Sequence, residues 1–155
     1  MELTSNESHA FIELALTRMM AAADRSGDVN ATPDLAGANS IFQLVTHCLG
    51  VAEYWLHHII VGAPSHRDRD SELAAVGSPE QIQTSVDEFL KRLPTLLEQV
   101  HSAPEIDRAA ALPSGDVQRW PMTNAGVLLH VIEELFQHAG HADITADLVC
   151  SISSP

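Results

Sequence analysis

The sequence predicts an all-α protein that folds as an antiparallel four-helix bundle. Ala and Leu are abundant while aromatic residues make up only 5% of the chain, a bias that favours helices over sheets. Four segments carry apolar residues at helical spacing, and no segment shows the apolar–polar alternation of a strand. At 155 residues the chain suits one domain, 1–155, that is stable without disulfide bonds.

The first helix is predicted from its capping signal. Thr4-x-x-Glu7 has the spacing of a capping box, in which two side chains satisfy the free backbone groups of the first turn. Residues at helical spacing follow, and these are Phe11, Leu14 (or Ala15), Arg18 and Met19. The helix is expected to end near Gly27, where a turn-rich stretch begins.

A second capping box, Ser40-x-x-Gln43, opens a helix predicted over Ile41–Val61. Gly62-Ala63-Pro64 stops this helix, and a polar loop, Ser65–Gly77, is expected after it. The connections on either side of the helix are each roughly 12–15 residues long, enough to cross the bundle rather than turn tightly.

The third helix has the clearest start signal in the chain, because Ser78 suits the N-cap and Pro79 suits the first helical position. A near-continuous apolar stripe follows. Pro94 within it predicts a kink, since proline removes a backbone hydrogen bond. This helix is expected to end before Pro104, and the last helix is predicted over about Thr123–Val149.

Charge and composition exclude several classes of partner. Eight basic residues against 21 acidic ones give a formal charge of −13, which repels phosphate backbones and anionic lipid, so neither nucleic acid nor membrane is an expected partner. No apolar run approaches the ~20 residues that span a bilayer, and residues 1–7 lack the features of a signal peptide. With only two cysteines, the chain is expected to be cytoplasmic.

Four ionisable residues share one narrow face of the last helix. At ~100° per residue their offsets place all of them within about 80° of one another. These residues are His130, Glu134, His138 and His141. Val127, Ile144 and Leu148 lie close to the same face, which makes it partly a core face. Burying such a row is costly unless the groups are paired or bind a metal ion, so the stripe predicts a metal site.

One ion cannot use the whole stripe, because its ends are about 16 Å apart along the helix axis. Neighbouring pairs can close on one ion, and the candidate pairs are His130/Glu134, Glu134/His138 and His138/His141. A third ligand must come from another helix, and His47 in the second helix is the best donor. A His/Glu/His set with an open position is typical of catalytic zinc or nickel-like sites.

Other candidate ligands fit less well. Glu53 and His57 also stand at i, i+4, but no second carboxylate set reproduces the Glu-x-x-His pattern of a di-iron bundle. Cys48 points ~100° away from His47, which favours packing over ligation. The remaining histidines, expected to be exposed or capping, are His9, His57, His58, His66 and His101.

Two segments together resemble one family. The first reads His47-x-x-Gly50-Val51-x-Glu53-Tyr54-Trp55 and is followed by Gly62. The second has Trp120 and then Leu129-His130-Val131-Ile132-Glu133-Glu134-x-x-x-His138-Ala139-Gly140-His141. This combination resembles the DinB-like superfamily over about residues 36–150, in the branch that contains mycothiol-dependent maleylpyruvate isomerase.

The resemblance implies a bundle of DinB-like type with long crossover connections, and a homodimer. It selects His47, Glu134 and His138 as ligands of a divalent metal ion, with zinc the first expectation and nickel the second. It implies an enzyme that activates mycothiol or another low-molecular-weight thiol for S-transfer or isomerisation of a small molecule. His141 or His130 would then orient a ligand or relay a proton. The alternative is a non-catalytic metal-binding module for stress response or dimerisation.

The chain departs from its relatives at one place. Relatives often carry an Arg-Glu pair after the histidine motif, whereas this chain reads Ile144-Thr145-Ala146-Asp147 there. A basic group for an acidic substrate or thiol must therefore come from elsewhere, and the candidates are Arg67, Arg69 and Arg119.

Overall fold

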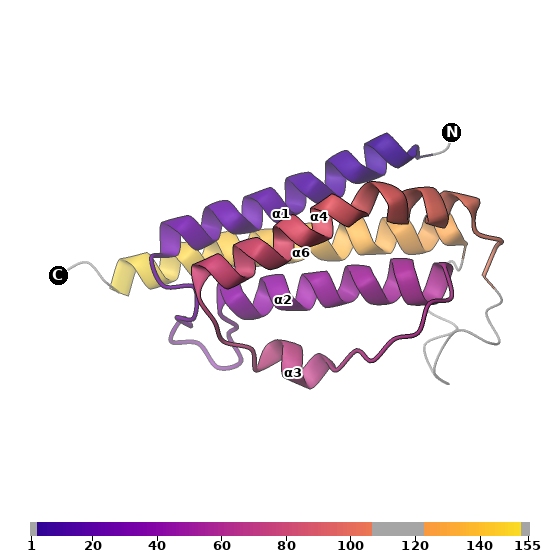
Figure 1. The fold of residues 1–155 in the computed structure, drawn as a ribbon. Coiled ribbons are helices and arrows are strands. Elements are labelled where there is room, and N and C mark those ends of the chain that lie inside the picture. The colour runs from indigo at the N-terminus through magenta and orange to yellow at the C-terminus, as the bar shows by residue number, and fades with distance from the viewer. Residues whose placement is uncertain (1–2, 107–122, 153–155) are drawn as a thin grey trace.

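The computed structural model describes residues 3–106 and 123–152 and shows a bundle of long helices (Figure 1). Within these ranges the regular structure is helical throughout, with no strand. The helices are α1 (Ser5–Ser26), α2 (Ile41–Ala52), the π-helix η1 (Glu53–Ile60), α3 (Arg69–Leu73), α4 (Pro79–Ser102) and α6 (Asn124–Ile152). Two residues used in the sequence argument, Arg119 and Trp120, lie outside the described residues.

The predicted start signals all cap helices. Thr4, Ser40 and Ser78 are the N-caps of α1, α2 and α4, and each forms a complete capping box with the residue three positions on. Gly27 ends α1 with φ of 70°, a left-handed conformation that glycine adopts without strain. Pro94 lies inside α4, which continues on both sides of it.

The helix directions follow from the connections in Figure 1. α1 and α2 run in opposite directions, and so do α4 and α6. The segment 27–40 joins neighbouring ends of α1 and α2, whereas the segment between η1 and α4 runs back along the bundle and contains α3. That second connection is the long crossover. α6 packs against α1, α2 and η1.

The core differs in two places from the predicted faces. In α1, Ala15 and Met19 are buried as the helical spacing requires, but Phe11 and Leu14 are 45% and 49% exposed. In α6, Val127 is buried while Ile144 is 60% exposed and Leu148 is also exposed, so the prediction that these two lie near a core face is wrong.

The buried residues of α6 explain this second difference. They include Val131, Leu135, Ala139 and Ala142, whose common direction lies about 100° around the helix from the histidine stripe. The stripe therefore runs along the edge of the core, with apolar packing on one side and solvent on the other. All four residues of the stripe are accordingly only partly buried.

The second predicted helix is interrupted by a change of helix type. α2 ends at Ala52, and η1 continues it with wider π-helical turns. The Val61 amide donates to the Leu56 carbonyl at 3.3 Å, five residues back. Such segments occur often at functional sites, and apolar periodicity alone does not reveal them.

A fourth difference is α3, which lies inside the segment predicted as a polar loop. Asp68 is its N-cap and accepts from the amides of Asp70 and Ser71. None of the helices in the described ranges has the length and apolar character that a bilayer span requires.

Candidate metal centre

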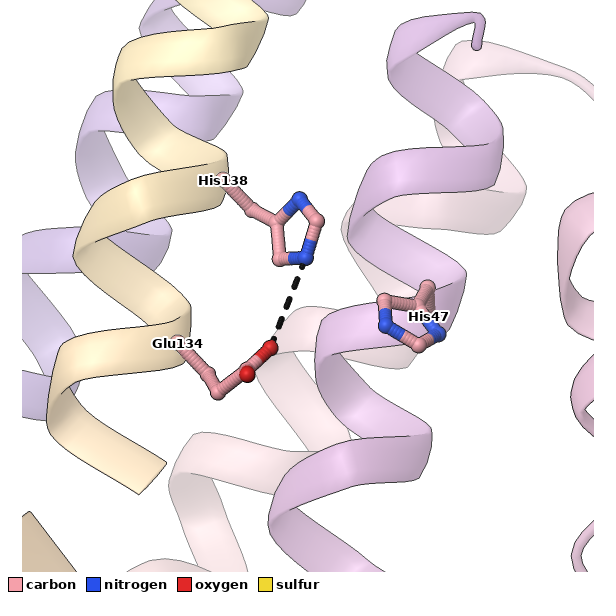
Figure 2. A group of neighbouring side chains, drawn as sticks. All are labelled: His47, Glu134 and His138. Carbon is pink, nitrogen blue, oxygen red and sulfur yellow. Dashed lines mark ion pairs between the residues drawn. The ribbon is translucent and has the colours of Figure 1, made fainter. Parts of the chain in front are cut away.

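The site begins with two side chains one turn apart on α6. Nε2 of His138 lies 3.6 Å from Oε2 of Glu134, and these side chains are 23% and 28% exposed. Across from them α2 contributes His47, which is buried. The rings of His47 and His138 meet edge to face with centroids 5.1 Å apart. Figure 2 shows the three side chains converging on the space between the two helices.

These three side chains have the spacing that one metal ion requires. One ligand atom from each lies within 4.8 Å of the other two. The 3.6 Å between His138 and Glu134 exceeds an ordinary hydrogen bond. It is close to the ~3.4 Å edge of a tetrahedron with bonds of about 2.1 Å, the length of zinc–nitrogen and zinc–oxygen bonds. Two imidazoles and one carboxylate are also the donor set of catalytic zinc sites, in which water fills the fourth position.

His138 is in the protonation state that a ligand needs. Burial lowers its pKa from the ordinary value of 6.5, and the neighbouring His47 lowers it further, against the opposing effect of Glu134. The ring is therefore neutral at pH 7 and offers a lone pair. Its Nδ1 is buried and has no hydrogen-bond partner among the described residues. A neutral ring with its Nε2 beside Glu134 fits a metal ligand, whereas the orphaned Nδ1 lies on the other side of the ring from that atom.

A second layer of contacts, which the sequence did not predict, lies behind His47. Nδ1 of His47 is 2.8 Å from Oε2 of Glu72, a residue of α3. Arg67 donates to the same carboxylate twice, from Nε to Oε1 at 2.7 Å and from Nη2 to Oε2 at 2.9 Å. Burial raises the pKa of Glu72, but the bonds from Arg67 and His47 outweigh it, so the pKa lies below its ordinary value. Glu72 is thus a buried anion with strong partners.

The two histidines assigned to proton transfer flank the site on α6. His141 stacks on His138 with ring centroids 6.2 Å apart. His130 meets the ring of Trp55 on η1 edge to face at 5.1 Å, and its Nδ1 lies 3.6 Å from Glu133. His130, Glu133 and Glu134 also form a second group with metal-ligand spacing. Glu134 belongs to both groups, because it stands between them on the helix.

Of the three candidate basic residues, two are described, and both lie near the site. Arg67 is bound to Glu72 and also lies over the ring of Tyr54 at 5.6 Å. Arg69 is exposed, and its charge contributes to the lowered pKa of His138. Burial strongly raises the pKa of the Cys48 thiol, and Cys48 belongs to neither group of described residues with metal-ligand spacing.

Comparison with models of protein families shows which family this chain belongs to. A family model described as mycothiol S-transferase matches residues 15–149, which include the three converging side chains. The chain belongs to the mycothiol S-transferase family. Searches of curated proteins and of solved structures found no match.

Membership of the mycothiol S-transferase family agrees with the DinB-like resemblance in the sequence and with the helical bundle. The match begins inside α1 and ends inside α6, so it covers α2, the crossover with α3, and α4. Glu72 and Arg67 therefore lie within the matched region, as do His130 and His141.

Proposed function

We propose that this protein is a metal-dependent transferase that conjugates a small thiol, of the mycothiol type, to an electrophilic small molecule. The observation that carries the proposal is the convergence of His47, Glu134 and His138 within 4.8 Å, in a chain of the mycothiol S-transferase family. These three residues would hold a divalent ion, with zinc expected before nickel. When bound, such an ion lowers the pKa of a coordinated thiol and so supplies a thiolate nucleophile at neutral pH.

The protein's own residues supply the rest of the chemistry. His141 stacks on a ligand histidine at the edge of the core, where it can accept the proton that the thiol releases. His130, on the other side of Glu134, is a second group able to hold a proton. Arg69 is exposed near His138 and, of the described candidates, is the basic group available to an acidic part of the thiol or its electrophile.

Metal content tests the binding half of the proposal. Protein purified without a histidine tag or added metal should contain about one equivalent of zinc or nickel by elemental analysis. His47→Ala and His138→Ala should lose it, because two remaining ligands do not complete a site. His101→Ala is a matched control, since His101 is exposed on α4 away from the site. Metal content that stays near one equivalent in both ligand variants would contradict the assignment.

Turnover tests the catalytic half. The metal-loaded protein should conjugate mycothiol to monochlorobimane faster than the uncatalysed reaction, and His138→Ala should abolish the difference. Bacillithiol and glutathione in parallel would identify the preferred thiol. Metal binding without turnover by any of the three thiols would favour the non-catalytic metal-binding module instead.

The homodimer implied by the family resemblance stays a prediction. Phe11 and Leu14 are large exposed apolar side chains on α1, and Phe11 contacts Phe136 of α6 at 6.4 Å between centroids. An interface over this part of α1 and α6 would cover them. Light scattering should then give roughly twice the chain mass of 16.8 kDa, and Phe11→Ser should lower it towards the monomer.

A further inference from the structure

The position of His47 depends on a residue that folds back onto it from the crossover connection. Glu72 lies on α3, 25 residues further along the chain, yet its carboxylate is 2.8 Å from Nδ1 of His47. The side chains of His47 and Glu72 are only 7% and 10% exposed. A buried carboxylate is costly unless its oxygens are bonded, and here both oxygens accept from Arg67.

This arrangement determines which nitrogen of His47 carries the proton. A carboxylate held ionised by an arginine can only accept, so Nδ1 of His47 must be the donor. The arginine is a poorer partner for that nitrogen, since Nη2 of Arg67 is 3.4 Å from it. With the proton on Nδ1, the lone pair is on Nε2. Figure 2 shows one ring nitrogen of His47 on the side of Glu134 and His138, and the other pointing away from them.

We propose that Glu72 is a positioning residue that fixes the tautomer and the ring orientation of His47, and that Arg67 holds Glu72 in place for this task. The proposal rests on the proposed metal site. Carboxylate–histidine–metal arrangements of this kind raise the basicity of the ligand and fix its ring, and losing the outer carboxylate typically costs 10–100-fold in metal affinity.

The backbone of α2 is adapted to the same contact. A Cβ placed on Gly50 would lie 2.1 Å from Oε1 of Glu72, much closer than any real contact. Glycine at this helical position therefore makes room for the carboxylate beside His47, one turn earlier on α2. Helix propensity alone favours alanine here, so the space for Glu72 gives a physical reason for glycine.

The simplest rival is that Glu72 only anchors the crossover segment to the bundle. In that case its loss would affect stability but not the tautomer of His47. Another rival is that Arg67 is a free cation for substrate. Its two bonds to Glu72 and its low exposure, 18% of the side chain, argue against that role.

The test measures the tautomer and the metal affinity separately. In the metal-free protein, long-range ¹H–¹⁵N correlation of ¹⁵N-histidine reports whether His47 carries its proton on Nδ1 or Nε2. Zinc affinity is measured by competition with a chromophoric chelator. The variant is Glu72→Gln. Its amide nitrogen would replace one carboxylate oxygen and face an N–H group of His47 or Arg67, so at least one hydrogen bond of the cluster would be lost. The control is Glu53→Gln, since Glu53 also pairs with a histidine and an arginine but belongs to neither group of described residues with metal-ligand spacing.

Wild type should show the proton of His47 on Nδ1. Glu72→Gln should shift His47 towards the other tautomer and weaken zinc binding 10–100-fold. Glu53→Gln should leave the tautomer of His47 unchanged and change the zinc affinity by less than twofold. Gly50→Ala keeps the carboxylate of Glu72 but displaces it, so it should also shift the tautomer of His47 and weaken zinc binding. This variant tests the proposal if Glu72→Gln does not fold. An unchanged tautomer, or an unchanged zinc affinity, in folded Glu72→Gln or Gly50→Ala overturns the proposal. Wild type that binds no metal would instead refute the proposed function, while the tautomer measurement would still report on Glu72.

Discussion

Two clusters in this protein contain the same three residue types in different surroundings. The buried cluster is His47, Glu72 and Arg67, and the surface cluster is His57, Glu53 and Arg92. In the buried cluster the three side chains are 7%, 10% and 18% exposed, whereas in the surface cluster they are 42%, 32% and 56% exposed. The carboxylate–histidine distance is 2.8 Å in the first cluster and 3.5 Å in the second.

The difference in exposure between the two clusters shows that the strength and the geometry of an ion pair depend on its surroundings. Water competes for every group of the surface cluster, so its geometry is loosely determined and its net stabilisation is small. The groups of the buried cluster are much less exposed to solvent, so each depends more on its protein partners. Of the two clusters, only the buried one can hold its histidine ring in one tautomer, and only it contains a predicted metal ligand, His47.

The largest expected effect is a difference in coupling energy. A double-mutant cycle on Arg67→Ala and Glu72→Ala in the metal-free protein should give ~2 kcal/mol, in the range of hydrogen bonds to charged groups. The same cycle on Arg92→Ala and Glu53→Ala should give ~0.5 kcal/mol. Urea unfolding followed by circular dichroism measures both.

Salt provides the control for this comparison. Raising the ionic strength to about 1 M shortens the Debye length to ~3 Å, which should remove most of the surface coupling and little of the buried coupling. Equal couplings in the two clusters, or equal salt dependence, would show that the burial difference has no energetic consequence.

A smaller effect is expected from pH. The pKa of Glu72 in the folded protein is below its ordinary value of 4.5. Its contribution to stability is therefore fully present above that value and is lost as the pH falls through the folded pKa. Between pH 6 and pH 3 the free energy of unfolding should fall more steeply for the wild type than for Glu72→Gln. Urea titrations of metal-free protein at several pH values measure this, and parallel curves would contradict it.

The surface cluster could be predicted in part from the sequence, and the buried cluster could not. Glu53 and His57 stand at i, i+4, as do Glu134 and His138, so helical geometry alone brings each pair together. Glu72 contacts His47 only because the crossover folds back along α2. Asp68 gives a local signal for the N-cap of α3, but no local signal predicts where a short helix docks.

The same distinction holds for the fold. Capping boxes are local, and Thr4, Ser40 and Ser78 were predicted correctly as helix starts. Which face of a helix is buried depends on its neighbours. The exposure of Ile144 and Leu148 arises because α1 and α2 cover a different side of α6, which periodicity along one helix does not determine.

A change of sign is expected between two glycines. Gly50 and Gly140 both lie inside helices, and neither has a left-handed φ. Replacing either by alanine should gain about 0.5–1 kcal/mol from helix propensity alone. A Cβ on Gly140 would meet nothing within 4 Å, so Gly140→Ala should stabilise the protein by that amount. A Cβ on Gly50 would collide with Glu72, so Gly50→Ala should destabilise it by about 1 kcal/mol.

The control for this comparison is to make Gly50→Ala in a second variant that lacks the Glu72 carboxylate. If the collision with the buried cluster is the cause, removing the carboxylate with Glu72→Ala should free the space. Gly50→Ala should then become stabilising in that background, by an amount similar to Gly140→Ala, in urea unfolding of metal-free protein. Destabilisation that persists without Glu72 would mean that α2 requires glycine for another reason, and that the buried cluster does not determine the residue at position 50.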